Sequence, residues 1–519
     1  MAERTLYQSA PVMRLYIAEH PFHYEMENLC RIFFPYHRIE TIPCGTDGNG
    51  AHILDYGTLG AYTGMQTELG GIRLQARLFF GRRERTAEER TSLSFPGDLK
   101  ELERRMGVLL FGLLTQACAY TPKWGILTGV RPIKLLRSLA ERMGEEAALQ
   151  SFQQDWLVSA EKTELSRITM GNEQKILSLS RPESFSLYVS IPFCPTRCSY
   201  CSFVSSSVER TAKLIPEYLE LLCVEIQHTA EVAKGLGLRL ESVYIGGGTP
   251  TTLSAEQLAQ LLDTITAAFD MSTCREFTVE AGRPDTITAE KLKAILPRGV
   301  TRISINPQTL NDHVLETIGR RHTAAQTLEA FSLARACGYD DINMDLIVGL
   351  PEDTMESFQE TMQGVLALHP ESITVHTLSL KRSARIFQDD SEPFSRDAAL
   401  AGDMLDWGDA QLLQHGYTPY YLYRQSRMVG NLENTGWAKQ GKESLYNVYI
   451  MDETHTILAC GAGAVTKVRD PYSDQLKRIF NFKYPYEYIR RHGEMLTRKE
   501  QVRTIYEEYW RARQTLSSV

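Results

Sequence analysis

The sequence predicts an α/β protein whose largest part is an incomplete parallel barrel of six strand–helix units, with a small α/β domain and a helical region before it and a smaller region after it. The 519 residues exceed what one hydrophobic core usually organises. From Phe185 onward, short β-branched or aromatic runs alternate with amphipathic stretches, and clusters of unusual residues stand where the runs end. We therefore expect four parts, at residues 1–95, 96–180, 181–395 and 396–519.

The first part has the pattern of strands. The runs RLYIA at 14–18 and IRLQARLFF at 72–80 are rich in residues that favour strands. A glycine-rich turn, CGTDGNG at 44–50, lies between them. This pattern indicates a small α/β domain.

The second part has helical periodicity. Apolar residues recur at helical spacing in LKELERRMGVLLFGLLTQA at 99–117, in PIKLLRSLAERM at 132–143 and in the stretch 159–179. Pro132 suits the first turn of a helix, where its missing N–H costs nothing. We expect this part to be mostly helix.

The third part repeats a unit of strand, turn and helix. Six such units predict parallel strands joined by right-handed crossovers, in a barrel that is incomplete compared with the closed eight-unit form. In folds of this kind the chemistry lies at the carboxyl ends of the strands. The six expected strands are LYVSI at 187–191, SVYIG at 242–246, FTVEA at 277–281, RISIN at 302–306, INMDLIV at 342–348 and SITVHTL at 372–378.

Composition argues against several classes of function. The formal net charge of −8 supplies no overall basic field for nucleic-acid phosphates, so we expect no nucleic-acid partner. The most apolar window, Met106 to Tyr120, is shorter than the roughly 20 residues that a membrane-spanning helix needs. The N-terminal stretch lacks the basic and apolar segments of a secretory signal. We therefore expect a soluble, cytoplasmic protein with no membrane span.

The ten cysteines differ in their spacing. Seven stand singly, whereas Cys194, Cys198 and Cys201 share one loop after the first barrel strand. Ligation by thiolates alone favours an iron–sulfur cluster or zinc. No fourth Cys or His follows closely, which favours a [4Fe–4S] cluster with one open iron over structural zinc. The alternatives without a metal are a chance cluster and a redox-sensing group of thiols.

Unusual residues also mark the ends of the later strands. GGGTP at 246–250 follows the second strand, where missing side chains allow either a close backbone approach to a ligand or a tight turn. Glu280 ends the third strand, Gln308 follows the fourth, and Arg320 lies farther along. Asp345 interrupts the fifth strand, and a buried carboxylate needs a polar partner. The candidates for that partner are Arg320 and a bound ligand.

The Cys-x3-Cys-x2-Cys loop, with an aromatic residue before its last cysteine, resembles the signature of the radical S-adenosylmethionine (SAM) superfamily. TPKWGILTGVRPIK at 121–134 and GNLENTGWAKQGKESLYNVYIM at 430–451 are similar to the HemZ branch of one family in it, called coproporphyrinogen dehydrogenase. The resemblance implies a radical SAM barrel with a [4Fe–4S] cluster and SAM as cofactors. That family is the HemN-like oxygen-independent coproporphyrinogen III oxidases, and the resemblance to it spans about residues 185–470. The motifs that carry the resemblance are LYVSIPFCPTRCSYC, YIGGGTPTTL, FTVEAGRPD, RISINPQTLN, IGRRHT and NMDLIVGLPEDT.

The resemblance assigns roles to individual residues. It implies that Tyr188 lies near bound SAM and acts in the catalytic set with the three loop cysteines, and that the backbone of Tyr200 contacts SAM. Adjacent Arg321 competes with Arg320 for its role, and only the register favours Arg320. The implied cluster ligands are Cys194, Cys198 and Cys201, and the other positions that line one or two SAM molecules are Gly247, Gly248, Thr249, Glu280, Gln308, Arg320, Asp345 and Leu378.

The implied reaction is oxidative decarboxylation of coproporphyrinogen III to protoporphyrinogen IX in porphyrin and haem biosynthesis, without molecular oxygen. A SAM-derived 5′-deoxyadenosyl radical would take a hydrogen from the propionate carbon next to the ring, and loss of CO2 and one electron would form the vinyl group. The expected partners are a tetrapyrrole substrate, an electron donor and an electron acceptor. Two alternatives stay open, a haem chaperone and a radical SAM enzyme that modifies haem.

A substrate with four carboxylates requires cations at the mouth of the barrel. Tyr420, Tyr421 and Tyr423 either face the tetrapyrrole or belong to a strand, and we expect His376 to line the barrel and not to bind iron. The candidate cations are Lys381, Arg382, Arg385, Arg424, Arg427, Lys439 and Lys442.

Overall fold

A computed structural model describes residues 11–44, 59–81, 83–201, 205–379, 394–425 and 428–517. The chain divides into two compact units, of which the first comprises Met1–Arg167, Asp390–Asp403 and Arg424–Glu433, and the second comprises the rest. The domain boundaries expected at 95, 180 and 395 stay predictions. None of the helices in the described stretches combines the length and apolarity needed to cross a membrane. Four candidate cations lie outside the described residues, namely Lys381, Arg382, Arg385 and Arg427.

The described residues of the first unit form a five-stranded mixed sheet in the order β2-β1-β3-β4-β5. Strand β1 runs parallel to β2 and β3, while β3, β4 and β5 pair antiparallel. The expected strands RLYIA and IRLQARLFF are confirmed as parts of β1 and β4. The bounds are β1 (Val12–Ala18), β2 (Arg38–Cys44), β3 (Leu59–Glu68), β4 (Gly71–Phe80) and β5 (Arg83–Thr91).

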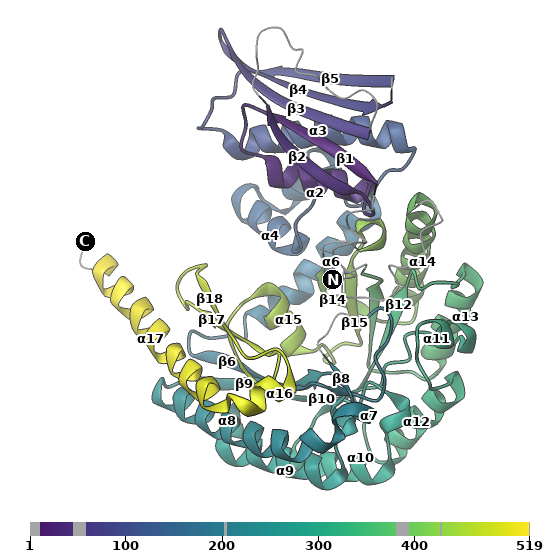
Figure 1. Ribbon diagram of the computed structural model, residues 1–519, viewed down its shortest axis with the longest axis vertical. Coiled ribbons are helices and arrows are strands. Elements are labelled where there is room, and N and C mark those ends of the chain that lie inside the picture. The colour runs from purple at the N-terminus through teal and green to yellow at the C-terminus, as the bar shows by residue number, and fades with distance from the viewer. Residues whose placement is uncertain are drawn as a thin grey trace. The chain divides into compact units, whose positions relative to one another are not determined.

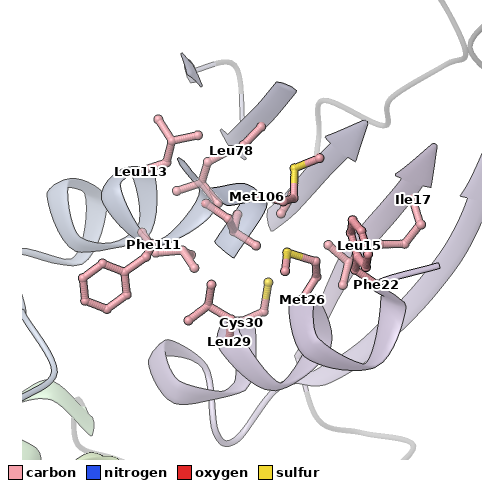
Figure 2. Close-up of a cluster of buried hydrophobic side chains, with 14 of the residues drawn as sticks. Leu15, Ile17, Phe22, Met26, Leu29, Cys30, Leu78, Met106, Phe111 and Leu113 are labelled. Carbon is pink, nitrogen blue, oxygen red and sulfur yellow. The ribbon is translucent and has the colours of Figure 1, made fainter. Parts of the chain in front are cut away.

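Two helices pack on this sheet and form its core. Alternate side chains of a strand point to opposite faces, so Leu15 and Ile17 of β1 share the face that meets the helices. Figure 2 shows Met26 facing Met106 in this cluster. Each such side chain stabilises the fold by about 1.5–3 kcal/mol when fully buried.

The helices that the second part of the sequence predicts are confirmed. The helix bounds are α2 (His23–Phe33), α3 (Leu99–Cys118), α4 (Pro132–Met143), α5 (Glu145–Gln154) and α6 (Ala160–Leu177).

The second unit contains the six parallel strands that the sequence predicts. They lie side by side in chain order, and each neighbouring pair is parallel. Figure 1 shows helices α8, α9, α10, α12 and α13 along the outer side of this curved sheet. The strands are β6 (Ser184–Ile191), β9 (Arg239–Gly247), β10 (Glu276–Glu280), β11 (Arg302–Ser304), β12 (Ile342–Val348) and β13 (Ser372–Thr377). The helices are α8 (Ile215–Gly235), α9 (Ala255–Ala268), α10 (Ala289–Ile295), α11 (Asp312–Thr317), α12 (Ala324–Ala336) and α13 (Met355–Ala367).

Strands from the C-terminal region extend this sheet at both edges. β15 pairs antiparallel with β13 and with β14, while β16 adds in parallel to β6 and continues into β17 and β18. Among the described residues the order runs from β14 to β18 without closing, as expected for an incomplete barrel. The bounds are β14 (Thr418–Tyr423), β15 (Asn434–Ala438), β16 (Thr456–Cys460), β17 (Val465–Arg469), β18 (Leu476–Phe480), α14 (Phe394–Gln414), α15 (Leu445–Asp452), α16 (Pro485–Arg490) and α17 (His492–Ser517).

Candidate functional site

The cysteine loop leaves the barrel at the carboxyl end of β6. It begins with a short strand, β7 (Phe193–Cys194), that pairs in parallel with β8 (Ser206–Ser207). The Ser199 N–H donates a hydrogen bond of 3.0 Å to the Ile318 carbonyl oxygen. Cys198 is buried, at 9% exposure, and the other two loop cysteines are partly exposed. The loop is therefore anchored at two places, by the pairing of β7 with β8 and by the bond from Ser199 to the segment after α11.

The three loop thiols do not meet at one point. In the part of the chain that the structure describes, no three His, Cys, Asp or Glu side chains converge where a single metal ion would bind. A multi-iron cluster binds each thiolate through a different iron, so its ligands need not share one point as the ligands of a single ion do. The assignment of the three loop cysteines as the ligands of such a cluster stays a prediction.

The glycine turn after β9 lies directly on the cysteine loop. The Gly248 N–H donates to the Ile191 carbonyl at 2.8 Å, and the Thr249 N–H donates to the Phe193 carbonyl at 2.7 Å. A Cβ added to Gly248 would lie 2.5 Å from the Phe193 oxygen, so this contact alone requires glycine. The Thr249 hydroxyl donates to Cys194 Sγ at 3.6 Å. Burial raises the pKa of the Cys194 thiol, and the Thr249 hydrogen bond opposes that rise.

Five of the six parallel strands carry one half-buried side chain among buried neighbours. Tyr188, Tyr244, Glu280, Asp345 and His376 hold these places on β6, β9, β10, β12 and β13. The Tyr244 hydroxyl donates to Glu280 Oε1 at 2.6 Å. His376 Nε2 lies 3.7 Å from Asp345 Oδ2, as a barrel-lining residue would. These contacts gather the side chains from successive strands into one set.

The two carboxyl groups of this set differ in their protonation. Burial raises the pKa of Glu280 to about 7, and the negative charge of Asp345 adds to the rise. Burial would also raise the pKa of Asp345, but His376 and the Asn343 side-chain amide, at 2.7 Å, lower it. Arg320, one of the two candidates for the partner of Asp345, does not take that place, because His376 and Asn343 do. Near neutral pH the site holds one ionised carboxylate beside one that is partly protonated.

Arg320, and not Arg321, turns toward the cysteine loop. Its Nη2 donates to the Tyr200 hydroxyl at 3.0 Å and its Nη1 to the Asn306 carbonyl at 2.7 Å. Its Nε is buried and has no partner among the described residues. Arg321 is exposed and pairs with Glu209 at 3.0 Å. Arg320 thus retains an unused buried donor that a bound ligand would satisfy.

The remaining predicted positions also lie at the carboxyl ends of strands. Gly247 has φ +104°, a conformation that favours glycine. Gln308 is buried with φ +70°, and its backbone bridges to β12 through an N–H bond of 2.9 Å to the Asp345 carbonyl. A positive φ at a residue other than glycine costs free energy and is common at functional sites. Leu378 is buried, and its N–H donates to the Val348 carbonyl at 3.0 Å.

The structure adds three residues that sequence reasoning missed. The ring of Tyr446 stacks on Tyr244, with centroids 4.5 Å apart, and on Tyr188 at 6.1 Å. Arg283 Nη1 lies 3.9 Å from Cys198 Sγ. Tyr244 stands three residues before Gly247 in a predicted strand and Arg283 lies inside the motif FTVEAGRPD, so both had a local signal. Tyr446 lies inside the quoted motif at 430–451, but nothing in that motif indicated that its helix, α15, reaches the barrel strands.

Two of the three candidate cations that the structure describes, Lys439 and Lys442, are not at the carboxyl ends of the barrel strands. Because β15 runs antiparallel to β13, the residues that follow β15 lie at the amino ends of the barrel strands. There Lys439 Nζ donates to the His369 carbonyl at 2.9 Å, and Lys442 lies 3.7 Å from Asp341. The expectation that Lys439 and Lys442 lie at the mouth of the barrel is therefore wrong. Arg424 belongs to the first unit, where it is buried and donates to the Leu127 carbonyl at 2.9 Å. Of the three candidate tyrosines, Tyr420 and Tyr421 are buried side chains of β14.

Comparisons with known proteins find a family model, curated relatives and solved structures that match this chain. The family model described as the radical SAM superfamily matches residues 188–365. The chain is 38% identical, over 76% of its own length and 79% of the relative's, to the oxygen-independent coproporphyrinogen-III oxidase-like protein HemZ of Bacillus subtilis. It is also 32% identical, over 62% of its length and 79% of the relative's, to the heme chaperone HemW of Haemophilus influenzae. Among solved structures, coproporphyrinogen III oxidase (HemN) of Escherichia coli matches with a TM-score of 0.49 and 25% identity, over 62% of this chain and 72% of that one.

Proposed function

The chain belongs to the radical SAM family of oxygen-independent coproporphyrinogen III oxidase-like proteins, and from this premise we propose that it converts coproporphyrinogen III to protoporphyrinogen IX without molecular oxygen. The observation that carries the proposal is the long alignment with the Bacillus relative, which extends well beyond the barrel. Members of the superfamily use a [4Fe–4S] cluster and SAM. Each of two propionate side chains would lose CO2, one hydrogen and one further electron to become a vinyl group.

The residues at the carboxyl ends of the strands fit these cofactors. Cys194, Cys198 and Cys201 would hold the cluster, and the buried Nε of Arg320 offers a donor to an anionic group of SAM. When bound, the pair supplies a 5′-deoxyadenosyl radical that removes a hydrogen atom from an unactivated C–H bond. Glu280 Oε1, which accepts from Tyr244, would accept further hydrogen bonds from the hydroxyl or amino groups of SAM.

The aromatic side chains would shield this chemistry from water. Tyr188, Tyr244 and Tyr446 stack within 15–22° of parallel. Tyr446 is buried at 6% exposure and would help to close the barrel interior to solvent. A closed, dry interior prevents solvent from quenching reactive species.

The experiment is an anaerobic incubation of the reconstituted protein with coproporphyrinogen III, SAM, dithionite and an electron acceptor, followed by porphyrin analysis and assay of 5′-deoxyadenosine. We expect porphyrins with one and two vinyl groups, formed together with 5′-deoxyadenosine. Cys198→Ala is the matched control and should give neither. A protein with an intact cluster that cleaves SAM but yields no vinyl product would contradict the proposal.

A haem chaperone is the second candidate, and the long match to the Haemophilus relative favours it. The same preparation separates the two functions. Stoichiometric binding of haem and its transfer to an acceptor protein, without decarboxylation of coproporphyrinogen III, would indicate the chaperone.

A further inference from the structure

Arg283 is a buried cation whose guanidinium forms an ion pair with the carboxylate of Asp285. It follows β10, and its side chain is only 4% exposed. Its Nε and Nη2 each donate to one oxygen of Asp285, at 2.9 Å in both cases. Burial would raise the pKa of Asp285, but the bonds from Arg283 lower it, so this carboxylate is ionised at neutral pH. A two-point contact of this kind fixes the plane of the guanidinium.

The free edge of that guanidinium faces the cysteine loop. Nη1 donates to the Thr196 hydroxyl at 3.1 Å and makes a long hydrogen bond of 3.9 Å to Cys198 Sγ. The carboxylate therefore lies on the side of Arg283 away from the sulfur. Arg320 also lies near Cys198, so Arg283 is one of two arginines beside this thiol.

A second cation stands close by without an acid to balance it. Arg320 donates to Tyr200 and to the Asn306 carbonyl, and no acidic side chain within the described stretches forms an ion pair with it. Burial, and then the positive charges of Arg320 and Arg283, lower the pKa of His322 to about 4, so His322 is neutral. The loop therefore sits in a positive local field, to which the pair of Arg283 and Asp285 adds a directed N–H dipole.

We propose that Arg283, oriented by Asp285, raises the reduction potential of the iron–sulfur cluster bound by this loop. The inference rests on the proposed assignment of the three cysteines as cluster ligands. Reduction adds one electron, taken from a one-electron donor, to a cluster that already carries thiolate charge, and no bond to the protein forms or breaks. An N–H donor and a positive charge at a ligand sulfur stabilise the more negative, reduced form, and both are known determinants of cluster potential. Asp285 lowers the potential in turn, because its charge offsets that of Arg283.

The test is a redox titration of the reconstituted full-length protein with dithionite under argon, followed by the EPR signal of the reduced cluster, with no porphyrin present. Arg283→Gln should lower the reduction equilibrium constant about tenfold, which corresponds to about 59 mV for one electron. Asp285→Asn should shift the potential upward by less, because the Asp285 side chain is 24% exposed and solvent screens it. Arg321→Gln is the matched control, since its exposed pair with Glu209 should leave the potential unchanged.

Opposite shifts from the two variants would support the electrostatic role, since a purely structural role predicts no such opposition. Equal potentials in wild type, Arg283→Gln and Asp285→Asn, or shifts in the same direction, would overturn the inference. If Arg283→Gln fails to assemble a cluster, Arg283→Lys is the second variant. It keeps the positive charge but loses the two-point contact with Asp285, and its reduction potential should be lowered by less. A wild-type protein that binds no cluster would instead contradict the proposed function and its cysteine assignment.

Discussion

Both ends of the six parallel strands carry buried polar side chains, and the two ends differ in how completely those side chains are paired. At the amino ends, the carboxylate of Glu276 accepts from the Ser444 hydroxyl at 2.9 Å and from the Leu445 N–H at 2.5 Å. Arg302 lies 3.2 Å from Asp341 in an ion pair. These groups find their partners inside the protein, as groups that stabilise a fold do.

At the carboxyl ends the pairing is incomplete. Glu280 has a pKa raised to about 7, Arg320 has a buried Nε without a described partner, and Gln308 holds a positive φ. Each of these features costs free energy in the absence of a ligand. The difference teaches that unsatisfied polar groups, and not polar groups as such, mark the end where ligands bind.

The largest expected effect at the carboxyl ends is the loss of the cluster. Cys198→Ala should abolish bound iron and sulfide, and all SAM cleavage with them, because a cluster left with two protein thiolates is not retained. Iron analysis after anaerobic reconstitution measures this. Cys337→Ala, at the end of α12, is the control and should keep wild-type iron. Wild-type iron in Cys198→Ala would show that the site assignment is wrong.

At the amino ends, removal of one ion-pair partner should affect stability and leave SAM affinity unchanged. Arg302→Leu removes the closer of two cations beside Asp341 and leaves Lys442 at 3.7 Å, so we expect a cost of about 3 kcal/mol, the lower end for a broken buried pair. Burial already raises the pKa of Asp341 to about 6, and loss of Arg302 raises it further, so the deficit should shrink as the pH falls toward 6 and stay constant below it. Urea denaturation measures the change. Arg298→Leu breaks an exposed pair with Asp263 and should cost about 1 kcal/mol or less.

At the carboxyl ends, Glu280→Gln should raise the free energy of unfolding, which is the opposite of the change expected for Arg302→Leu. The pKa of Glu280 in the folded protein, about 7, lies above its usual 4.5, so wild-type stability is lost as the pH rises through that interval. The Gln variant does not titrate there and should gain about 2 kcal/mol relative to wild type between about pH 5 and pH 8. Denaturation at the two pH values tests this. A stability difference that is the same at the two pH values would argue against the raised pKa of Glu280.

The smallest expected effect concerns the stacked rings. Tyr446→Ala removes two aromatic contacts, each worth about 0.5–1.5 kcal/mol, and should weaken SAM binding about tenfold by releasing Tyr188. Equilibrium dialysis of labelled SAM against the reconstituted protein gives the dissociation constant. Tyr446→Phe keeps the ring and serves as the control. Equal affinities in wild type and Tyr446→Ala would limit the role of this ring to folding.

Much of the fold could be predicted because its signals are local. Alternation of strand runs with amphipathic stretches predicted the six strands in order, and the spacing of Cys194, Cys198 and Cys201 predicted a thiolate site at the end of the first strand. Glu280 and Asp345 stood out because a carboxyl group is unusual inside an apolar run. Such signals need only a few neighbouring residues, which any single sequence contains.

The sequence by itself determined the parallel strands, the loop that carries the cysteines and the residues at the strand ends, since these depend on periodicity and spacing. Only the tertiary structure decided which groups meet. It paired Asp345 with His376, brought Tyr446 from α15 onto Tyr188, and put Lys439 at the amino ends of the strands. The physical reason is that these contacts depend on the antiparallel direction of β15 and on strand order, which are set by packing over long separations and leave no local pattern.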